Sequence, residues 1–199
     1  MTDEALLEAW RGGDARAGQT LLERYFKPLY RFFANKVDHE ADELIQRTML
    51  ATVRGRDQFR GQSSFRSYLF VIARHELHRF YRDRRRDRLV FDPEQSSVFE
   101  LTQSPSTLAA KRQEQQLLLE ALRRLPIELQ TALELHYWEE LSTAELAEAL
   151  EIPQGTVKSR LRRARERLEQ EIAKLVADPE QQRATLDQLD GLGEQLRSR

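Results

Sequence analysis

Residues 141–161 have the sequence LSTAELAEALEIPQGTVKSRL, which is typical of two helices joined by a tight turn. Ser142 to Glu145 match a capping box, in which the serine oxygen and the glutamate carboxylate each accept a hydrogen bond from a backbone N–H that a first helical turn leaves unpaired. A helix is therefore predicted from Thr143 to Leu150. Ile152-Pro153 interrupts the pattern, and a longer helix is predicted from Gln154 to about Val176. This arrangement is a helix-turn-helix, whose second helix enters the major groove of DNA.

The second of these helices is amphipathic and basic. Its apolar residues recur at helical spacing, at Val157, Leu161, Ala164, Leu168 and Ile172. Six Lys or Arg residues oppose one acidic residue between positions 155 and 168. The residues best placed for base edges are Gln154, Thr156, Lys158 and Ser159. The arginines expected on phosphates are Arg160, Arg162, Arg163 and Arg165. A solvated helix of a bundle without a ligand would also be basic, but the capped first helix, the turn and the clustering together favour DNA binding.

The composition favours helices and excludes several kinds of site. Hydrophobic residues make up 40% of the 199 residues, while only 8 Gly and 6 Pro are available for the turns of a β fold. We predict an all-α protein of two small helical domains joined by a flexible linker, the second containing the helix-turn-helix. The absence of Cys excludes disulfides and thiolate zinc sites and fits a reducing cytoplasm. No apolar run approaches the roughly 18 residues that cross a bilayer, and the acidic start Met1-Thr2-Asp3-Glu4 lacks signal-peptide character. We therefore expect a cytoplasmic location without membrane insertion.

The apolar pattern divides the chain into four parts. Residues 1–90 are predicted to form an N-terminal helical bundle, in which Pro28 kinks or breaks the second helix. Residues 91–112 lose periodicity, contain two X-Pro pairs and are rich in Ser, Gln and Glu, which predicts a linker. Residues 113–177 are predicted to form the helix-turn-helix domain. Residues 178–199 are a tail whose leucines favour a weak helix interrupted by Gly191 and Gly193. We hypothesise that this tail packs on one of the domains and tempers activity.

A second basic surface is predicted between Arg54 and Arg88, where eleven arginines oppose four acidic residues although the whole chain carries a net charge of -1. The aromatic residues interleaved with them are Phe59, Phe65, Tyr68, Phe70, Phe80 and Tyr81. Basic side chains that follow a phosphate backbone, with aromatic rings for unstacked bases, are what single-stranded DNA binding requires. Phe65, Leu69 and Ala73 share a helical face, however, so several rings are expected in a core.

The sequence contains no pattern typical of catalysis. His75-Glu-Leu-His78 differs from the zinc-protease signature because its histidines are three rather than four positions apart. A phosphate-binding loop, a dinucleotide-binding turn and a nucleophile elbow are all absent from the sequence. We therefore predict no catalytic residues, no metal and no cofactor.

Four segments resemble the extracytoplasmic-function class of bacterial RNA polymerase sigma factors, over about Asp3 to Leu175. Residues 40–49 (EADELIQRTM) look like the helix that docks on the coiled coil of the polymerase β′ subunit. Residues 59–74 (FRGQSSFRSYLFVIAR) are similar to the segment that captures a flipped non-template base and melts the minus-ten element. Residues 125–130 (LPIELQ) and 141–161 look like the region that binds the minus-thirty-five element.

The resemblance implies a sigma factor that binds core RNA polymerase through its β′ and β subunits, recognises both promoter elements and promotes DNA opening without catalysing a reaction. The residues implied in polymerase binding are Asp42, Glu43, Leu44, Gln46 and Met49. Those implied in binding the minus-ten element and single-stranded DNA are Arg60, Gly61, Gln62, Ser63, Ser64, Phe65, Arg66, Tyr68, Arg74, His75, Arg79 and Arg82. Promoter DNA is the expected nucleic-acid partner, and the class also admits an anti-sigma factor.

Some positions depart from what members of this class often have. His75 follows Ile-Ala-Arg where Asn is frequent, and Arg79 stands where an acidic residue is frequent. In the docking helix, Met49 and Val53 replace an aromatic pair. These differences affect the promoter preference to be expected.

Two other classes of protein are compatible with the residues alone. A stand-alone helix-turn-helix regulator would use the N-terminal bundle for dimerisation or ligand sensing and would bind a palindromic duplex without polymerase. A nucleic-acid-processing enzyme would use Asp38, Glu40, Asp42 and Glu43 as metal-binding carboxylates. The aliphatic alternation beside these carboxylates favours an exposed docking face instead.

Overall fold

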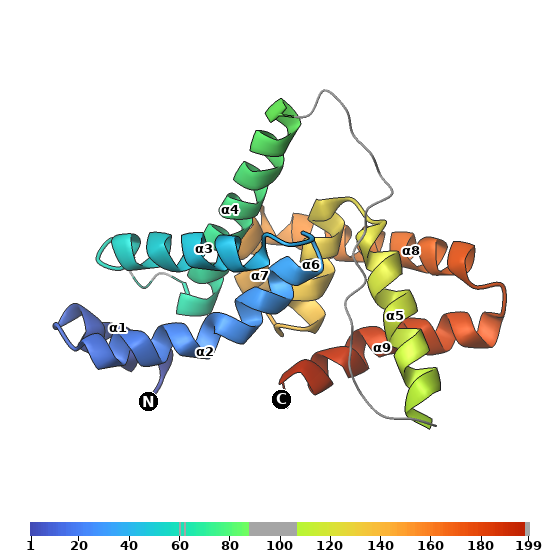
Figure 1. The fold of residues 1–199 in the computed structure, drawn as a ribbon, viewed down its shortest axis with the longest axis horizontal. Coiled ribbons are helices and arrows are strands. Elements are labelled where there is room, and N and C mark those ends of the chain that lie inside the picture. Colours follow the sequence, from blue (N-terminus) through green and yellow to red (C-terminus); the bar gives the residue numbers. More distant parts are fainter. Residues whose placement is uncertain (60, 62, 88–106, 198–199) are drawn as a thin grey trace. The chain divides into compact units, whose positions relative to one another are not determined.

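The computed structural model describes residues 1–59, 61, 63–87 and 107–197, and this part of the chain contains α-helices and no strand. The helices are α1 (Asp3–Arg11), α2 (Ala15–Ala34), α3 (Ala41–Gly55), α4 (Phe65–Asp87), α5 (Thr107–Arg123), α6 (Ile127–Tyr137), α7 (Thr143–Leu150), α8 (Gln154–Leu175) and α9 (Pro179–Arg197), drawn in Figure 1. The all-α prediction is confirmed. Among the described helices, none has the length and apolar character of a membrane span.

The helices group into two compact units. The first contains α1 to α4, and the second contains α5, α6, α8, α9 and most of α7. Residues 88–106, which include positions 91–106 of the predicted linker, lie outside the described residues, as do Arg60 and Gln62. Each unit has its own buried core and is considered by itself below.

Side-chain caps begin the first two helices of the first unit. The Thr2 hydroxyl accepts a hydrogen bond from the Ala5 N–H at 3.3 Å, and the Asp14 carboxylate accepts from Arg16 N at 2.9 Å and Ala17 N at 3.1 Å. These bonds satisfy N–H groups that have no partner within the helix. α2 then continues through Pro28 to Ala34, so the break that the sequence allowed at this proline is absent from the helix.

The core of the first unit is aromatic and aliphatic. α2 packs against α1 and α3, and α3 packs against α4. Phe33, Phe65, Phe70, Leu21, Leu29, Leu44, Leu69 and Leu77 are fully or almost fully buried. The Trp10 ring lies directly over Gly18, where a Cβ would approach its Nε1 to 2.4 Å, so glycine allows α1 to pack closely on α2.

In the second unit, α8 contacts α5, α6 and α9. The buried cluster that joins them consists of Leu118, Ala121, Leu122, Leu125, Leu133, Trp138, Ala164, Leu168, Ile172 and Leu189. Burial of this cluster removes apolar surface from water, and each Å² removed stabilises the unit by about 25 cal/mol. The basic helix predicted from the sequence is therefore anchored along one side in a core to which three other helices contribute.

Two boundaries of the second unit differ from those expected. α5 begins at Thr107, so residues 107–112, which were predicted to be part of the linker, are helical. The C-terminal tail is one helix, α9, that passes through Gly191 and Gly193 without the predicted interruption. Leu189 is 1% exposed, which confirms that the tail packs on a domain. Core contacts outweigh the roughly 1 kcal/mol by which each glycine disfavours a helix.

Candidate nucleic-acid interfaces

The helix-turn-helix forms from the capping box and a turn of three residues, 151–153. The Glu145 carboxylate accepts a hydrogen bond from Ser142 N at 3.0 Å, and the Ser142 hydroxyl accepts one from Glu145 N at 3.2 Å. After α7, Glu151 adopts the left-handed conformation with φ 54°, and Ile152 N donates to Ala147 O at 3.0 Å. Pro153, at φ -58°, precedes the first residue of α8. The predicted capping box, turn and helix start are confirmed.

α8 presents most of the expected DNA-binding residues to solvent. Val157, Ala164 and Leu168 form its buried side. The exposed residues are Gln154, Thr156, Lys158, Ser159, Arg162, Arg163 and Arg165. The Gln154 amide donates to the Thr143 hydroxyl on α7 at 3.0 Å, which ties the start of α8 to the preceding helix. A groove-facing surface of this kind matches the second helix of a helix-turn-helix.

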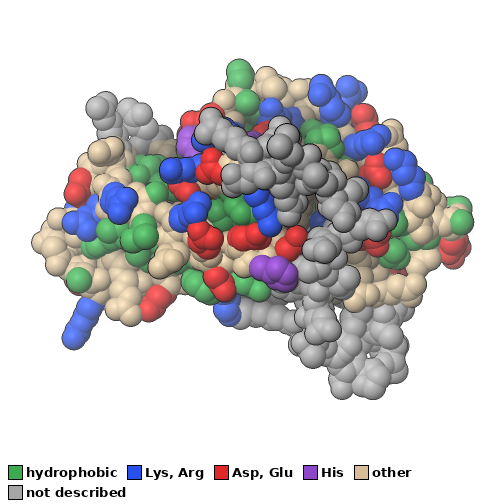
Figure 2. Space-filling model, turned by 45° about the horizontal axis from the view of Figure 1, so that its top comes forward, with side chains coloured by type: hydrophobic (Ala, Val, Ile, Leu, Met, Phe, Trp, Pro, Cys, Tyr) green, Lys and Arg blue, Asp and Glu red, His purple; other side chains and the backbone are tan. Residues whose placement is uncertain are grey.

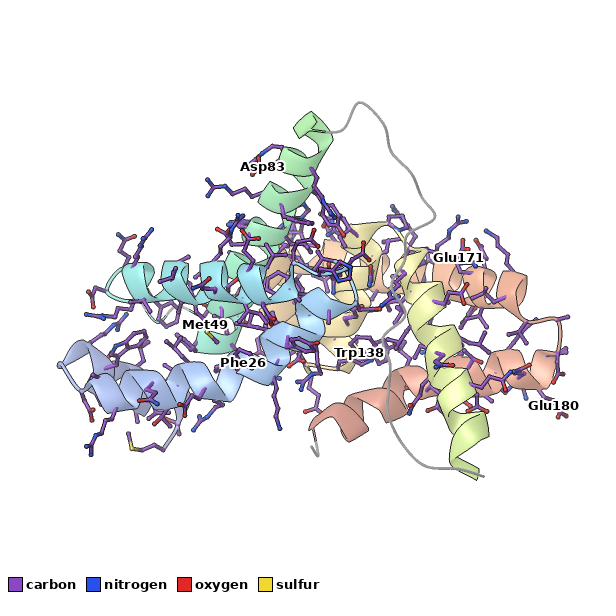
Figure 3. All side chains as sticks on the ribbon, in the orientation of Figure 1. Phe26, Met49, Asp83, Trp138, Glu171 and Glu180 are labelled. Carbon is purple, nitrogen blue, oxygen red and sulfur yellow. The ribbon has the colours of Figure 1, made fainter. Side chains whose placement is uncertain are left out.

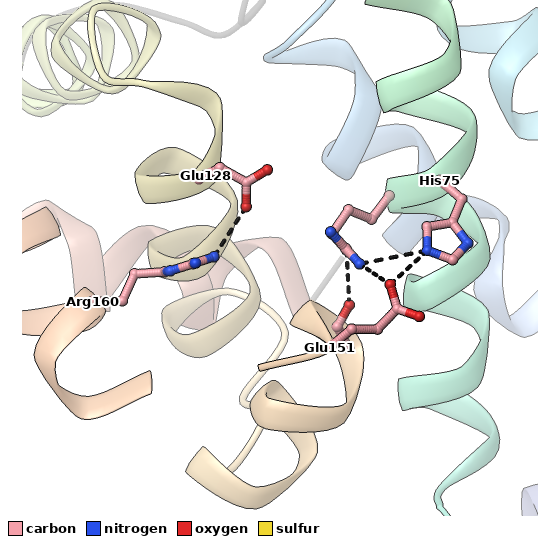
Figure 4. A network of polar contacts seen from close by, with 6 residues as sticks. His75, Glu128, Glu151 and Arg160 are labelled. Atoms are coloured by element: carbon pink, nitrogen blue, oxygen red, sulfur yellow. Dashed lines mark hydrogen bonds and ion pairs between the residues drawn. The ribbon is translucent and has the colours of Figure 1, made fainter. Parts of the chain in front are cut away.

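Arg160 is placed differently from the other arginines of α8. Its side chain is 21% exposed, and its Nη1 donates to Glu128 Oε2 on α6 at 3.0 Å, as drawn in Figure 4. Arg165 lies 3.5 Å from Glu169 and also donates to the Tyr137 hydroxyl at 3.2 Å. Spacing along one helix could not reveal either partner on α6, because both are distant in sequence.

The basic surface of the first unit lies mainly on α4. His75, Arg79 and Arg82 are exposed on this helix, and Gly61 is exposed in the segment that precedes it. The half-buried members of the predicted set are Ser63, Ser64, Arg66, Tyr68 and Arg74. The Ser64 hydroxyl accepts a hydrogen bond from Ser67 N at 3.1 Å and so caps the helix. Arg60 and Gln62, also in the predicted set, cannot be placed because they lie outside the described residues.

Two residues predicted to contact a partner are core residues instead. Phe65 is 2% exposed, and its ring centroid lies 5.5 Å from that of Tyr25. Leu44 is 1% exposed. Apolar side chains on the inner face of an amphipathic helix are buried even when the neighbouring positions form an interface. Both residues therefore support their surfaces from beneath.

Tyr68 has a fixed position beside the start of α4. Its ring centroid is 4.7 Å from that of Phe59. Its hydroxyl packs so closely on Gly55 that a Cβ on that residue would be only 2.4 Å from the oxygen. Burial raises the pKa of the Tyr68 phenol, so the hydroxyl remains protonated at neutral pH. The Tyr68 ring is thus a half-exposed aromatic surface held by packing on both sides.

An open groove of about 600 Å³ runs between α3 and α4 in the first unit. It is lined by Arg47, Leu50, Ala51, Arg54, Gly55, Gln58, Glu76, Arg79 and Asp83. Of these residues only Arg79 had been assigned to a site from the sequence. Its lining combines three arginines with two carboxylates and with the side chain of Leu50, which is 48% exposed.

The outer surface of α3 bears the expected polar residues. Asp42, Glu43 and Gln46 are exposed, and Met49 is half-buried. Phe26, on the adjacent helix α2, is 48% exposed; Figure 3 labels it and Met49 on these two helices.

Phe26 is exposed although it lies among the apolar residues of α2. Tyr30, one turn further along α2, is 37% exposed. Tyr25 is buried and precedes Phe26 directly, and consecutive helical residues point about 100° apart. The i, i+4 spacing of Phe26 and Tyr30 was the available signal for an aromatic surface.

Charged groups of both signs are mixed on the surface. Figure 2 shows a face on which Lys and Arg side chains alternate with Asp and Glu side chains. Glu40, one of the carboxylates considered as a metal ligand, pairs with Arg84 at 2.7 Å, and Glu43 pairs with Arg47. Two of the four carboxylates that a metal-dependent enzyme would need are thus engaged with arginines.

Family models match both units. The model for sigma-70 region 2 matches residues 19–87, and the model for sigma-70 region 4 matches residues 115–168. The two matches include α4 and the helix-turn-helix, respectively.

Curated relatives and solved structures are similar over most of the chain. The ECF RNA polymerase sigma-E factor of Haemophilus influenzae is 29% identical over 185 residues, covering 88% of this chain and 98% of the relative. The factor of the same name from Escherichia coli K12 is 27% identical, with 88% and 97% covered. A structure of CnrH in complex with the cytosolic domain of CnrY has a TM-score of 0.64 at 22% identity, covering 88% of this chain and 98% of that one.

A co-crystal structure of the sigma factor RpoE with the anti-sigma factor NepR from Bartonella quintana has a TM-score of 0.58 at 24% identity, covering 80% of this chain and 96% of that one. At these identities the two structures show the fold. The presence of both sigma-70 regions, in order and on separate units, excludes a stand-alone helix-turn-helix regulator. The chain belongs to the extracytoplasmic-function class of bacterial RNA polymerase sigma factors.

Proposed function

We propose that this sigma factor binds core RNA polymerase through the outer surface of α3, contacts the minus-thirty-five element with α8 and opens the minus-ten element with the basic surface of α4. The observation that carries the proposal is the separation of two basic surfaces onto two units, each matched by the corresponding sigma-70 region. The proposed domains are 1–90 and 113–177; the described helix α5 extends the second to Thr107, and α9 packs in the same core through Leu189.

For the duplex, the exposed residues Lys158, Ser159, Arg162 and Arg163 are the proposed contacts of α8. Positively charged side chains on phosphates supply affinity that falls with salt, while contacts to base edges supply specificity. Gln154 and Thr156 lie at the N-terminus of α8, which enters the groove first in a helix-turn-helix.

For the open strand, Arg79 and Arg82 are exposed on α4, and Arg79 also lines the groove between α3 and α4. Unpairing a base costs a few kcal/mol, which contacts to the displaced strand must offset. Cations that hold phosphates and the Tyr68 ring as a stacking surface supply such contacts. This mechanism uses binding energy alone and requires no catalytic residue, metal or cofactor.

For the polymerase, Asp42, Glu43, Gln46 and Met49 are the proposed contacts, and Phe26 extends this docking surface onto α2. Phe26 and Met49 lie on two helices that pack together, and aromatic residues and methionine are enriched in protein interfaces. Binding to the polymerase and the chromosome places the protein in the cytoplasm. The two solved structures contain CnrY and the anti-sigma factor NepR, which supports an anti-sigma factor as a further partner.

The test is transcription with purified core polymerase and a promoter library. Replacing both Arg162 and Arg163 with Ala should reduce initiation about tenfold or more while polymerase affinity stays unchanged. Arg183→Ala, which removes an exposed arginine on α9, is the matched control and should have little effect. A wild-type chain that does not bind core polymerase would refute the proposal.

The role of α4 is tested separately with a promoter that already contains an unpaired bubble. Arg79→Ala should reduce initiation from duplex DNA, and the pre-opened bubble should restore most of it. An equal defect on both templates would assign Arg79 to a step other than opening.

A further inference from the structure

The arginines of α8 fall into two groups by their surroundings. The side chain of Arg162 is 80% exposed, whereas that of Arg160 is 21% exposed. Arg160 pairs at 3.0 Å with Glu128, which lies in the first turn of α6. A carboxylate in a first turn is also favoured by the positive end of the helix dipole. Glu128 is therefore a well-stabilised anchor for one arginine of α8.

This pair fixes the part of α8 that would face a DNA duplex. Arg160 lies between the buried Val157 and the exposed Ser159 on the helix surface, so it flanks the groove-facing side. The Gln154–Thr143 hydrogen bond holds α8 at its first residue, and the Arg160–Glu128 pair holds the helix again six residues later. Base readout needs side chains placed to within about 0.5 Å, which only a supported helix provides.

We propose that Arg160 is a positioning residue for promoter recognition: its ion pair with Glu128 sets the orientation of α8 against α6, and Arg160 makes no phosphate contact. The inference rests on the proposed role of α8 at the minus-thirty-five element. It separates Arg160 from the expected phosphate-binding arginines, and it gives Glu128, a residue without an assigned role, a part in specificity.

Substitution of Glu128 distinguishes the two roles of Arg160, because they predict opposite changes in DNA affinity. If Arg160 bound phosphate, Glu128→Gln would release it and remove a negative charge near DNA, and binding would become tighter. If the pair positions α8, Glu128→Gln weakens specific binding although the chain becomes less acidic. Arg160→Gln then has the same effect as Glu128→Gln, and the effects of the two substitutions are not additive.

The experiment uses holoenzyme made from the full chain and core polymerase, with a duplex that the wild-type holoenzyme enriches from a randomised promoter library and a scrambled duplex. Glu128→Gln and Arg160→Gln are each expected to lower the ratio of the two affinities about tenfold. Neither should change the slope of log affinity against log salt, whereas Arg163→Gln should reduce its magnitude by about 0.9. Circular dichroism confirms that each variant is folded.

The charge-swapped chain, Glu128→Arg with Arg160→Glu, restores an ion pair and should recover most of the lost discrimination. Tighter binding by Glu128→Gln, a reduced salt slope for Arg160→Gln, or a swapped chain worse than either single variant would overturn the inference. A wild-type holoenzyme that enriches no duplex would overturn the proposed function of α8, and this inference with it. Any of the first three results from a discriminating wild type would overturn the inference alone.

Discussion

Replacing Leu189 with Ala should destabilise the unit that carries the helix-turn-helix. Leu189 lies in α9, beyond residues 115–168 that the sigma-70 region 4 model matches, yet it is 1% exposed and belongs to the same buried cluster as Leu168 and Trp138. Truncating a buried leucine to alanine costs about 2–5 kcal/mol, from lost transfer energy and the cavity left behind. Domains are stable by only about 5–15 kcal/mol, so this loss is a large fraction of the total.

The two tryptophans of the chain make the measurement specific to one unit. Trp10 is buried in the first unit and Trp138 in the second. In a Trp10→Phe background, urea unfolding followed by fluorescence therefore reports the second unit. Leu189→Ala should lower its unfolding free energy by at least about 2 kcal/mol. Leu186→Ala, at a half-buried position on the same helix, is the matched control and should cost less.

A change below about 0.5 kcal/mol, which is ordinary for a surface substitution, would refute the argument that α9 completes this core. Such a result would mean that the second unit does not depend on the packing of α9 for its stability. Equal losses for Leu189→Ala and Leu186→Ala would also contradict it, because the predicted difference comes from burial.

Three further predictions concern local features of the two units. Ser142→Ala removes the capping oxygen of α7 and should lower the unfolding free energy reported by Trp138 by about 0.5–2 kcal/mol; no change would contradict the role of the cap. Gly18→Ala should destabilise the first unit by about 1–3 kcal/mol despite better helix propensity, because the new Cβ would clash with Trp10, and a more stable variant would disprove that close packing. The hydrogen bond from Lys174 lowers the pKa of Glu171, so ionised Glu171 stabilises the fold above its unfolded pKa of 4.5, and this stabilisation is lost as the pH falls through the lower folded pKa. Glu171→Gln should therefore make Tm fall less steeply at acid pH than it does for the wild type, and an unchanged fall would count against this role of Glu171.

The helix-turn-helix could be predicted because its signals are local. The Ser142–Glu145 capping box and Pro153 mark helix boundaries within a few residues of chain, and α7 and α8 begin where these residues indicate. The periodicity of Val157, Ala164 and Leu168 also predicted which side of α8 is buried. Each of these signals depends on backbone geometry that a residue shares with its near neighbours.

The features that could not be predicted depend on contacts between distant residues. Arg160 looked like its neighbours in sequence, but its partner Glu128 is 32 positions away on another helix. Basic and aromatic interleaving could not separate the buried Phe65 from the half-exposed Tyr68, since both occur in one pattern. The glycines of the tail suggested a broken helix, whereas contacts of α9 with α5 and α8 stabilise a continuous one.

The chain has a net charge of -1, yet we propose that it binds a polyanion. This is possible because the exposed ion pairs on α8 are weak. Arg162 and Glu166 are 3.8 Å apart, with side chains 80% and 56% exposed. Such exposed i, i+4 pairs contribute only about 0.3–0.5 kcal/mol, so a DNA phosphate can replace Glu166 at little cost. The Arg160–Glu128 pair is shorter, at 3.0 Å, and its side chains are only 21% and 39% exposed, so water and salt screen it less. DNA should therefore recruit Arg162 while Arg160 stays with Glu128, so that the same helix is held in place and remains able to bind phosphate.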